Sequence, residues 1–213
     1  MIRVMLVDDH ALVRMGFRML LAGAPGGETI EVVAEVGSGE QACTDYPRAK
    51  PDVVVMDLSM PGMGGLEAVR RLLAQDPKAR ILALSAHEDT AHPRRVLKAG
   101  ALGYLAKRSA PEALIAAVSA VARGERYVDA QTAQALALAQ LDGQENPADV
   151  LSEREFSVFI QLARGRTVAQ IADSLNLSPS TVGTHLYNVK QKLRAGNQSE
   201  LTLVALRWGL IEA

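Results

Sequence analysis

Five residues in the first part of the chain could together do phosphoryl chemistry. They are Asp8, Asp9, Asp57, Ser85 and Lys107. Each of them stands at the end of a short apolar run. In an open parallel α/β sheet, the carboxyl ends of the strands meet at one edge, and ligands bind there. We therefore expect these side chains, which are far apart in the sequence, to share one site.

The residue types predict what such a site would do. Three crowded carboxylates repel one another, and a hard divalent cation relieves that repulsion. Mg²⁺ prefers one or two carboxylates together with phosphate oxygens. The Lys107 ammonium supplies a point charge for a phosphoryl group, and the Ser85 hydroxyl supplies a hydrogen-bond donor. The set therefore predicts phosphoryl transfer to a carboxylate through positioning and charge neutralisation.

Each of these residues, taken alone, has a simpler interpretation. Asp8 and Asp9 could cap the N-terminus of a helix. Lys107 could be a solvated loop lysine, and Ser85 could be an ordinary hydroxyl at a strand end. Their common placement at several strand ends favours a shared site over coincidence.

The elements that must position this site are predicted from hydrophobicity. Five short runs are nearly continuously apolar, as are strands buried on both faces of a parallel sheet. These runs are Arg3–Val7, Ile30–Val36, Val53–Met56, Ile81–Ser85 and Gly103–Ala106. Helices are expected at Ala11–Leu21, Gly39–Ala49, Gly65–Gln75, Pro93–Ala99 and Pro111–Arg123. The alternation predicts an α/β domain over residues 1–124, with a doubly wound five-stranded parallel sheet, and Pro47 should kink or shorten its helix.

The sequence changes character after residue 124. Residues 125–150 read as a linker, with a helix at Gln131–Leu141 and a polar, flexible run at Asp142–Pro147. Residues 151–213 carry only helical periodicity and predict a small all-α domain. Its helix starts are marked by capping residues, and its last helix is expected near Ser199–Trp208. These capping residues are Ser152 with Glu155, Thr167, and Ser178 before Pro179.

The third helix of this domain has a polar face without any acid. Its inward positions are Val182, Leu186, Val189 and Leu193. The opposite stripe is Ser180, Thr184, Tyr187, Asn188 and Gln191, flanked by Lys190, Lys192 and Arg194. Such a surface suits base edges and phosphates in a major groove. An ordinary solvated helix face is the alternative interpretation, although such faces more often include acids.

Composition limits the remaining function classes. The 213 residues carry a net charge of −1, while the last 63 hold seven Lys or Arg against five Asp or Glu. That mild basic excess permits nucleic-acid binding without requiring it. Cys43 is the only cysteine, so no intrachain disulfide can form. The N-terminal apolar run is too short for a signal peptide, and we expect no membrane span and a cytoplasmic protein.

Several motifs over residues 1–124 resemble the receiver domain of response regulators. They are Val7-Asp8-Asp9-His10, Met56-Asp57-Leu58-Ser59-Met60-Pro61-Gly62, Leu84-Ser85-Ala86 and Gly103-Tyr104-Leu105-Ala106-Lys107. The resemblance implies that Asp57 is the phosphoacceptor and that Lys107 contacts the phosphoryl group. It implies that Asp9, Asp57 and the backbone carbonyl of Ser59 bind Mg²⁺ directly, with Asp8 acting through water.

The same resemblance implies a switch formed by Ser85 and Tyr104. After phosphorylation, the Ser85 hydroxyl would bond a phosphoryl oxygen, and Tyr104 would rotate inward into the vacated space. A charge-assisted hydrogen bond contributes about 1.5–3 kcal/mol, which shifts a two-state equilibrium roughly 10- to 150-fold. A plain core aromatic is the alternative for Tyr104. Arg108 departs from the pattern, because many receivers have proline there.

The C-terminal motifs resemble the LuxR-type output domain. The matching stretches include Leu151-Ser152-Glu153-Arg154-Glu155 and Leu177-Ser178-Pro179-Ser180-Thr181-Val182-Gly183-Thr184-His185. The whole chain is similar to the NarL/FixJ family, and Gly100–Leu105 and Gly124–Tyr127 point to its global-activator subgroup. Family members often carry lysine or asparagine at the position of Gly183. We expect base readout by Thr184, Tyr187 and Asn188, and phosphate contacts from Ser180, Thr181, Lys190 and Lys192.

The resemblance implies a transcription regulator gated by phosphorylation. A sensor histidine kinase would phosphorylate Asp57, and the active chain would bind double-stranded DNA as a homodimer. A second apolar stripe on the last helix, Leu203, Leu206 and Leu210, could pair two protomers.

The chain would accept and self-hydrolyse an aspartyl phosphate without substrate turnover. One alternative is a regulator whose receiver no longer switches, but the complete acidic set argues against it. Another is an aspartyl phosphohydrolase. Such enzymes usually have an acid two residues after the nucleophile, where this chain has Ser59.

Overall fold

The computed structural model describes the chain except for residues 24–28, 86–90, 110, 142–146, 209 and 212–213. The chain divides into two compact units. Most of residues 1–137 form the first unit, and residues 138–213 form most of the second. None of the described helices is both long and apolar enough to cross a membrane.

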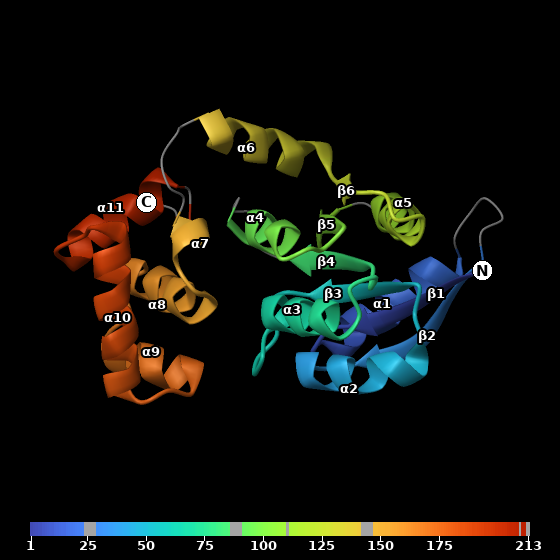
Figure 1. Ribbon diagram of the computed structural model, residues 1–213, viewed down its shortest axis with the longest axis horizontal. Helices are drawn as coiled ribbons and strands as arrows, with labels where there is room; N and C mark the ends of the chain where they lie inside the picture. Colours follow the sequence, from blue (N-terminus) through green and yellow to red (C-terminus); the bar gives the residue numbers. More distant parts are fainter. Residues whose placement is uncertain (24–28, 86–90, 110, 142–146, 209, 212–213) are drawn as a thin grey trace. The chain divides into compact units, whose positions relative to one another are not determined.

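A six-stranded parallel sheet forms the centre of the first unit, in the order β2-β1-β3-β4-β5-β6 (Figure 1). Its strands are β1 Ile2–Val7, β2 Ile30–Val36, β3 Val53–Asp57, β4 Ile81–Ser85, β5 Gly103–Ala106 and β6 Tyr127–Val128. The five predicted strands are confirmed, with ends that differ by at most one residue. The sixth was missed because two residues show no periodicity. Tyr127 and Val128 form a strand only by pairing with Gly103 and Tyr104 of β5.

Helices cover both faces of the sheet. They are α1 Ala11–Ala22, α2 Gly39–Ala49, α3 Gly65–Gln75, α4 Ala91–Lys98 and α5 Pro111–Ala122. Successive strand residues alternate between two cores: Met5 packs with residues of α2, α3 and α4, whereas Leu6 packs with residues of α1 and α5. This burial on both faces explains why the strands are continuously apolar.

The expected shortening of α2 at Pro47 is wrong, because the helix runs on to Ala49. Pro47 lies in the last turn of the helix, so its missing N–H removes only one hydrogen bond, close to the helix end. Lys50 then ends the helix in the left-handed conformation, with φ of 45°, and its N–H donates to the Tyr46 carbonyl. A late proline is therefore tolerated where a mid-helix proline would not be.

The predicted linker is helical in part. Its helix is confirmed as α6 Ala130–Leu141, and residues 142–146 of the predicted flexible run lie outside the described residues. Pro147, the last residue of that run, begins the short helix α7 Pro147–Val150, which was not expected. The second unit continues with α8 Glu153–Ala163, α9 Val168–Leu175, α10 Pro179–Leu193 and α11 Gln198–Arg207.

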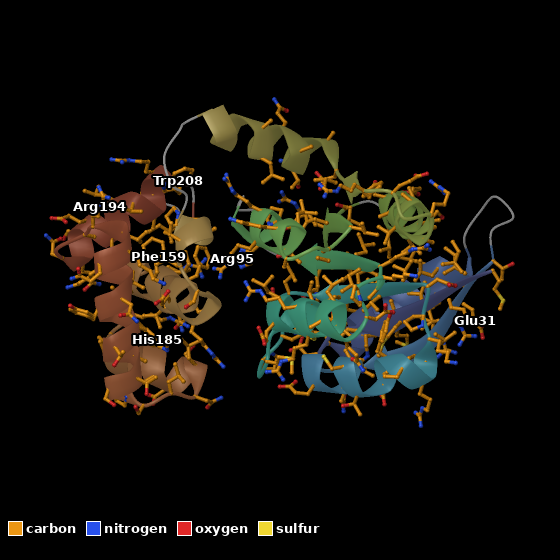
Figure 2. The ribbon with its side chains drawn as sticks, viewed as in Figure 1. Glu31, Arg95, Phe159, His185, Arg194 and Trp208 are labelled. Carbon is orange, nitrogen blue, oxygen red and sulfur yellow. The ribbon has the colours of Figure 1, made fainter. Side chains whose placement is uncertain are left out.

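Side-chain caps fix the starts of these helices. Ser152 with Glu155 and Thr167 with Gln170 form capping boxes at α8 and α9. The Ser178 hydroxyl accepts the Thr181 N–H at the start of α10. The predicted caps are therefore confirmed. The helices enclose a core that includes Phe159 on α8, and Trp208, directly after α11, packs against it (Figure 2).

A buried carboxylate joins the start of α8 to the end of α10. Glu155 is 5% exposed, and its Oε2 lies 2.7 Å from the Lys192 Nζ and accepts the Ser152 N–H at 2.8 Å. Burial by itself would raise the pKa of Glu155, but the hydrogen bonds from Lys192 and Ser152 outweigh it and hold the pKa below its usual value. Glu155 is thus both a cap and a tie between two helices.

Replacing Lys192 should weaken the second unit. Lys192→Met leaves the buried Glu155 carboxylate with one partner fewer, so we expect the free energy of unfolding to fall by about 1–2 kcal/mol. The lower part of that range is favoured because the lysine side chain is 42% exposed. Trp208, the single tryptophan, packs against this core, so its fluorescence during urea unfolding reports the change.

Lys190→Met is the matched control for this variant. It removes the same charge from the same helix, but the Lys190 ammonium donates to the Gly196 carbonyl at 3.4 Å and not to a buried carboxylate. Its effect should stay below about 0.5 kcal/mol. Equal losses of stability in the two variants would contradict the role given to the Glu155–Lys192 pair.

Candidate functional site

The strand register brings the predicted site residues to one edge of the sheet. Val7 pairs with Met56 across β1 and β3, and Asp57 pairs with Leu84 of β4. Asp8 follows β1 directly, so it stands beside Asp57. Ser85 ends β4 beside β5, and its carbonyl accepts the Lys107 N–H at 2.8 Å. The predicted strand ends therefore meet at one edge of the sheet in the structure.

Lys107 is the cation of the site. Its Nζ lies 2.6 Å from Asp8 Oδ2 and 2.8 Å from Asp57 Oδ2. Both carboxylates are buried, at 3% and 1% exposure. Burial alone would lower the pKa of Lys107, but the two carboxylates outweigh it and raise the pKa above its ordinary value. Lys107 therefore carries its charge at neutral pH and bridges two acids that would otherwise repel each other.

Three acids and His10 also form a group whose side-chain atoms are close enough together to hold a metal ion. Asp8, Asp9, His10 and Asp57 each offer one ligand atom, and these atoms lie within 4.8 Å of one another. Asp57 Oδ1 accepts the Ser59 N–H at 3.0 Å. Asp57 Oδ2 is buried and accepts no hydrogen bond from the described residues, although the Lys107 ammonium is close enough for an ion pair. Crowded carboxylate oxygens, one of them without a hydrogen bond, are donors that suit Mg²⁺.

Two residues at the edge of this site had no role in the sequence analysis. The His10 N–H donates to Asp8 Oδ1 at 2.8 Å, and its Nδ1 lies 2.9 Å from Asp9 Oδ1. The Arg14 guanidinium donates to the Asp8 carbonyl. His10 was discoverable because it directly follows the two acids. Arg14 comes four residues later on α1, a spacing that puts both residues on one helix face.

The predicted switch residues are both buried. Ser85 is 0% exposed and Tyr104 is 2% exposed. Tyr104 pairs with Ala83 in the sheet, and its ring belongs to the same core as Met56 and Val96. The ring therefore already occupies an inward position. The rotation of Tyr104, and the contacts of Ser85 and the Ser59 carbonyl with bound groups, stay predictions.

The predicted nucleic-acid surface lies along α10. Ser180, Thr184 and Tyr187 are exposed, Tyr187 at 64%, while Thr181 and Asn188 are partly buried. The opposite face holds Val182 and Val189 in the core. His185 and Arg194 mark the helix in Figure 2.

Some of the polar groups on this surface have partners within the domain. The Thr184 hydroxyl donates to the Ser180 carbonyl, and the Thr181 hydroxyl lies 2.8 Å from the Ser178 hydroxyl. Lys192 pairs with Glu155, so a phosphate contact would have to displace a buried partner. Gly183 is exposed, and apart from its chain neighbours and the backbone of its own helix no described atom lies within 4 Å of where a Cβ would stand, so packing does not require glycine there.

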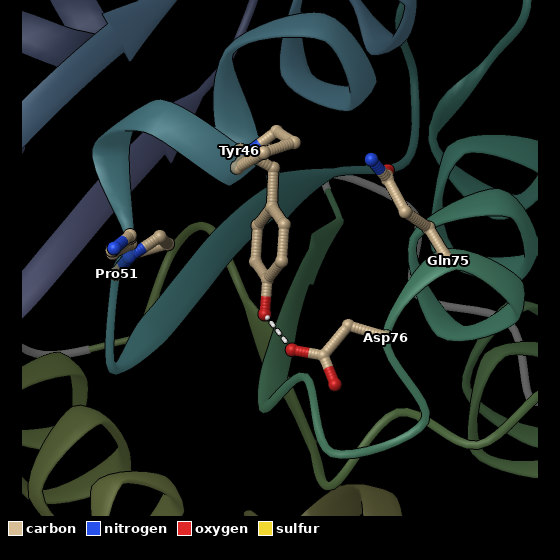
Figure 3. A pocket seen from close by; sticks show the side chains of 6 residues that line it. Tyr46, Pro51, Gln75 and Asp76 are labelled. Atoms are coloured by element: carbon tan, nitrogen blue, oxygen red, sulfur yellow. Dashed lines mark hydrogen bonds between the residues drawn. The ribbon is translucent and has the colours of Figure 1, made fainter.

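A cavity of about 360 Å³ lies elsewhere in the first unit (Figure 3). It is lined by Tyr46, Pro47, Lys50, Pro51, Gln75 and Asp76. The Tyr46 hydroxyl donates to Asp76 Oδ2 at 2.8 Å, and burial together with this acid raises the pKa of Tyr46 to about 12. The cavity adjoins the chain that enters β3, whereas Asp57 ends that strand. It therefore takes no part in the acidic site.

Two family models match the chain. The model described as "Response regulator receiver domain" matches residues 4–119. The model described as "Bacterial regulatory proteins, luxR family" matches residues 149–205. The first match contains every residue of the acidic site, and the second contains all of α10.

Whole-length relatives agree with both matches. The chain is 42% identical to response regulator GacA of Pseudomonas viridiflava, over 100% of this chain and 99% of the relative. It is 41% identical to response regulator UvrY of Escherichia coli strain K12, over 100% of this chain and 97% of the relative.

Solved structures of similar proteins agree as well. RcsB of Salmonella enterica serovar Typhimurium, bound to promoter P1flhDC in the presence of phosphomimetic BeF3⁻, is 27% identical, with a TM-score of 0.67 over 95% of this chain and 97% of that one. A LuxR-family response regulator from Aurantimonas sp. SI85-9A1 is 39% identical, with a TM-score of 0.62 over 66% of this chain and 98% of that one.

These matches confirm the resemblance found in the motifs, in both domains and over the full length. The chain belongs to the NarL/FixJ family of two-component response regulators, in the global-activator subgroup, and joins a receiver domain to a LuxR-type DNA-binding domain.

Proposed function

We propose that a sensor histidine kinase phosphorylates this regulator on Asp57, and that the phosphorylated chain controls transcription through DNA contacts of α10. The observation that carries the proposal is the Lys107 ammonium, held 2.6 Å from Asp8 and 2.8 Å from Asp57 at the sheet edge. In the transfer step, a carboxylate oxygen of Asp57 forms a P–O bond while the P–N bond of the donor phosphohistidine breaks. The imidazole of the donor leaves.

The residues around Asp57 would assist this transfer mainly by charge and position. Lys107 faces the phosphoryl oxygens as a fixed positive charge, which needs no reorganisation during the reaction. The Ser59 N–H donates to Asp57 Oδ1, whereas Asp57 Oδ2 is ion-paired with Lys107 and accepts no hydrogen bond from the residues that the structure describes. Asp9, Asp57 and the Ser59 carbonyl would hold Mg²⁺, with Asp8 acting through water, and the bound ion would neutralise phosphoryl charge.

The switch that follows would depend on Ser85 and Tyr104. A bond from the Ser85 hydroxyl to a phosphoryl oxygen favours the inward ring position, which Tyr104 occupies in the core. Phosphorylation would therefore stabilise an arrangement that the fold already permits. No substrate turnover is involved, and slow self-hydrolysis of the aspartyl phosphate would reset the switch.

Recognition of double-stranded DNA would use the exposed face of α10. Thr184, Tyr187 and Asn188 would contact base edges, while Ser180, Thr181 and Lys190 would hold phosphates. Lys192 would reach a phosphate only by leaving Glu155. Solved relatives include RcsB bound to a promoter and two RcsB dimers bound to two parallel DNAs. A regulator that acts on chromosomal DNA would work in the cytoplasm.

A homodimer would suit a palindromic site. Leu203 on α11 is 61% exposed and Leu206 is partly buried. Leu210 is 5% exposed and belongs to the domain core, so the predicted pairing stripe is shorter than expected. Leu210 follows α11 and folds back onto the domain, where its N–H donates to the Ala205 carbonyl at 2.9 Å. Leu203 and Leu206 would then form the contact between protomers.

Labelling with acetyl phosphate and Mg²⁺ tests the phosphoacceptor. Intact mass spectrometry should show stoichiometric addition of one phosphoryl group to the wild-type chain, and none to Asp57→Asn. Lys107→Met should slow labelling about tenfold or more, because the charge aimed at the phosphoryl group is lost. Lys78→Met, which removes an exposed lysine of the same domain, should label at the wild-type rate. An unlabelled wild-type chain would refute phospho-gating.

Two substitutions on α10 test the DNA surface. A duplex selected from a random library by the wild-type chain serves as the probe in a fluorescence anisotropy titration. Thr184→Ala and Tyr187→Ala should each weaken specific binding by about 1–3 kcal/mol, or roughly 5- to 150-fold, and leave non-specific binding nearly unchanged. Ser199→Ala, which removes an exposed hydroxyl from α11, should bind as the wild type does. Unchanged affinity in both α10 variants would remove that face from the interface.

A further inference from the structure

The backbone of the turn that follows Asp57 has positions that only glycine fits well. Gly62 and Gly64 take φ values of +75° and +73°, in the left-handed region that favours glycine. Gly65 begins α3, and a Cβ there would stand 2.0 Å from the Asp57 carbonyl oxygen. The turn therefore runs directly against the backbone of the phosphoacceptor. A small displacement of the turn would therefore shift the backbone of Asp57.

A carboxylate from α2 holds this turn from outside. Glu40 lies in the first turn of α2, 17 residues before Asp57, and its Oε1 accepts the Met63 N–H at 2.8 Å. A Cβ on Gly62 would stand 2.9 Å from the same Oε1. Both observations describe one contact: because Gly62 has no Cβ, the Glu40 carboxylate has room to approach the turn and accept the Met63 N–H.

The start of α2, which carries Glu40, is itself held in place. The Ser38 hydroxyl caps α2 by accepting the Gln41 N–H. A Cβ on Gly39 would stand 2.8 Å from the Ala68 Cβ and 3.3 Å from the Gly64 carbonyl oxygen, so the start of α2 packs closely on the same turn and on α3. Hydrogen bonds from the backbone N–H groups of Glu40 itself and of Met63 lower the pKa of the Glu40 carboxyl, which favours the charged acceptor.

We propose that Glu40 is a positioning residue of the phosphorylation site: it holds the 58–64 turn so that the Ser59 backbone stays in register with Asp57 and with a bound divalent cation. Ser59 connects the turn to the site, because its N–H donates to Asp57 Oδ1 at 3.0 Å. Glu40 touches no reacting atom. The inference rests on the proposed function of the acidic site, and it adds a residue from a different helix to its support.

Three variants of the full chain test this role. Glu40→Ala removes the acceptor, whereas Glu40→Gln keeps an oxygen at the same reach and removes only the charge. Glu112→Ala is the matched control, because Glu112 is an exposed acid in the first turn of another helix, α5. The dissociation constant for Mn²⁺, used as the probe ion, is measured from free Mn²⁺ by electron paramagnetic resonance. Acetyl phosphate labelling is followed at low and at saturating Mg²⁺.

We expect Glu40→Ala to bind Mn²⁺ about three- to fivefold more weakly, the size of one lost hydrogen bond at an exposed position. Its labelling should be slow at low Mg²⁺ and return to the wild-type rate at saturating Mg²⁺. Glu40→Gln and Glu112→Ala should match the wild type in both measurements. Recovery by saturating metal and rescue by glutamine separate positioning from a general loss of stability.

Two results would overturn the proposal. One is a Glu40→Ala variant that binds Mn²⁺ as well as Glu112→Ala does. The other is a Glu40→Gln variant as weak as Glu40→Ala, which would assign the effect to charge alone. A wild-type chain that binds Mn²⁺ but takes no phosphoryl group would refute the proposed function, and the Mn²⁺ affinities would still decide the role of Glu40.

Discussion

The ion pairs that Lys107 makes with Asp8 and Asp57 are the interaction on which the receiver depends. Two carboxylates at 3% and 1% exposure have lost most of their hydration, and each repels the other. Without a cation between them, such a pair would be strongly destabilising. The lysine is brought there by β5, the aspartates by β1 and β3, so strand register is what makes the site possible. A phosphoryl group at Asp57 would enter a place that already holds a fixed positive charge.

The DNA-binding domain uses the same kind of contact for a structural purpose. The Glu155 carboxylate is buried, accepts the Ser152 N–H at the start of α8 and binds Lys192 near the end of α10. In the receiver, the paired acid would be the reacting group, and the surrounding charges are placed to favour that reaction. In the second domain, the paired acid holds the helix whose far face would contact DNA. A buried carboxylate with a lysine partner is therefore not by itself a sign of chemistry, and its place at a strand end or a helix cap distinguishes the two cases.

The sequence predicted most of this architecture for identifiable physical reasons. Strands buried on both faces are continuously apolar, which is why the five long strands were found, and capping residues marked the helix starts. Tyr127–Val128 escaped because a two-residue strand exists only through its pairing with β5. Pro47 misled because its cost depends on the distance from the helix end.

For the site, strand ends identified Asp8, Asp57 and Lys107 because parallel strands deliver their carboxyl ends to one edge. Arg14 and Glu40 could not be found in the same way, because each contacts a backbone group, the Asp8 carbonyl and the Met63 N–H, and backbone groups leave no signal in the sequence. Lys192 was read as a phosphate contact because periodicity places it on the polar side. Only the fold shows that Glu155 reaches it.

Genome-wide DNA occupancy of the wild type beside Asp57→Ala, in the native cell under the stimulus that activates the regulator, tests the central claim most directly. The account predicts discrete sites for the wild type and their loss in Asp57→Ala, at equal protein levels. If both proteins occupied the same sites equally, the LuxR-type domain would still bind DNA, but control of that binding by phosphorylation of Asp57 would be contradicted.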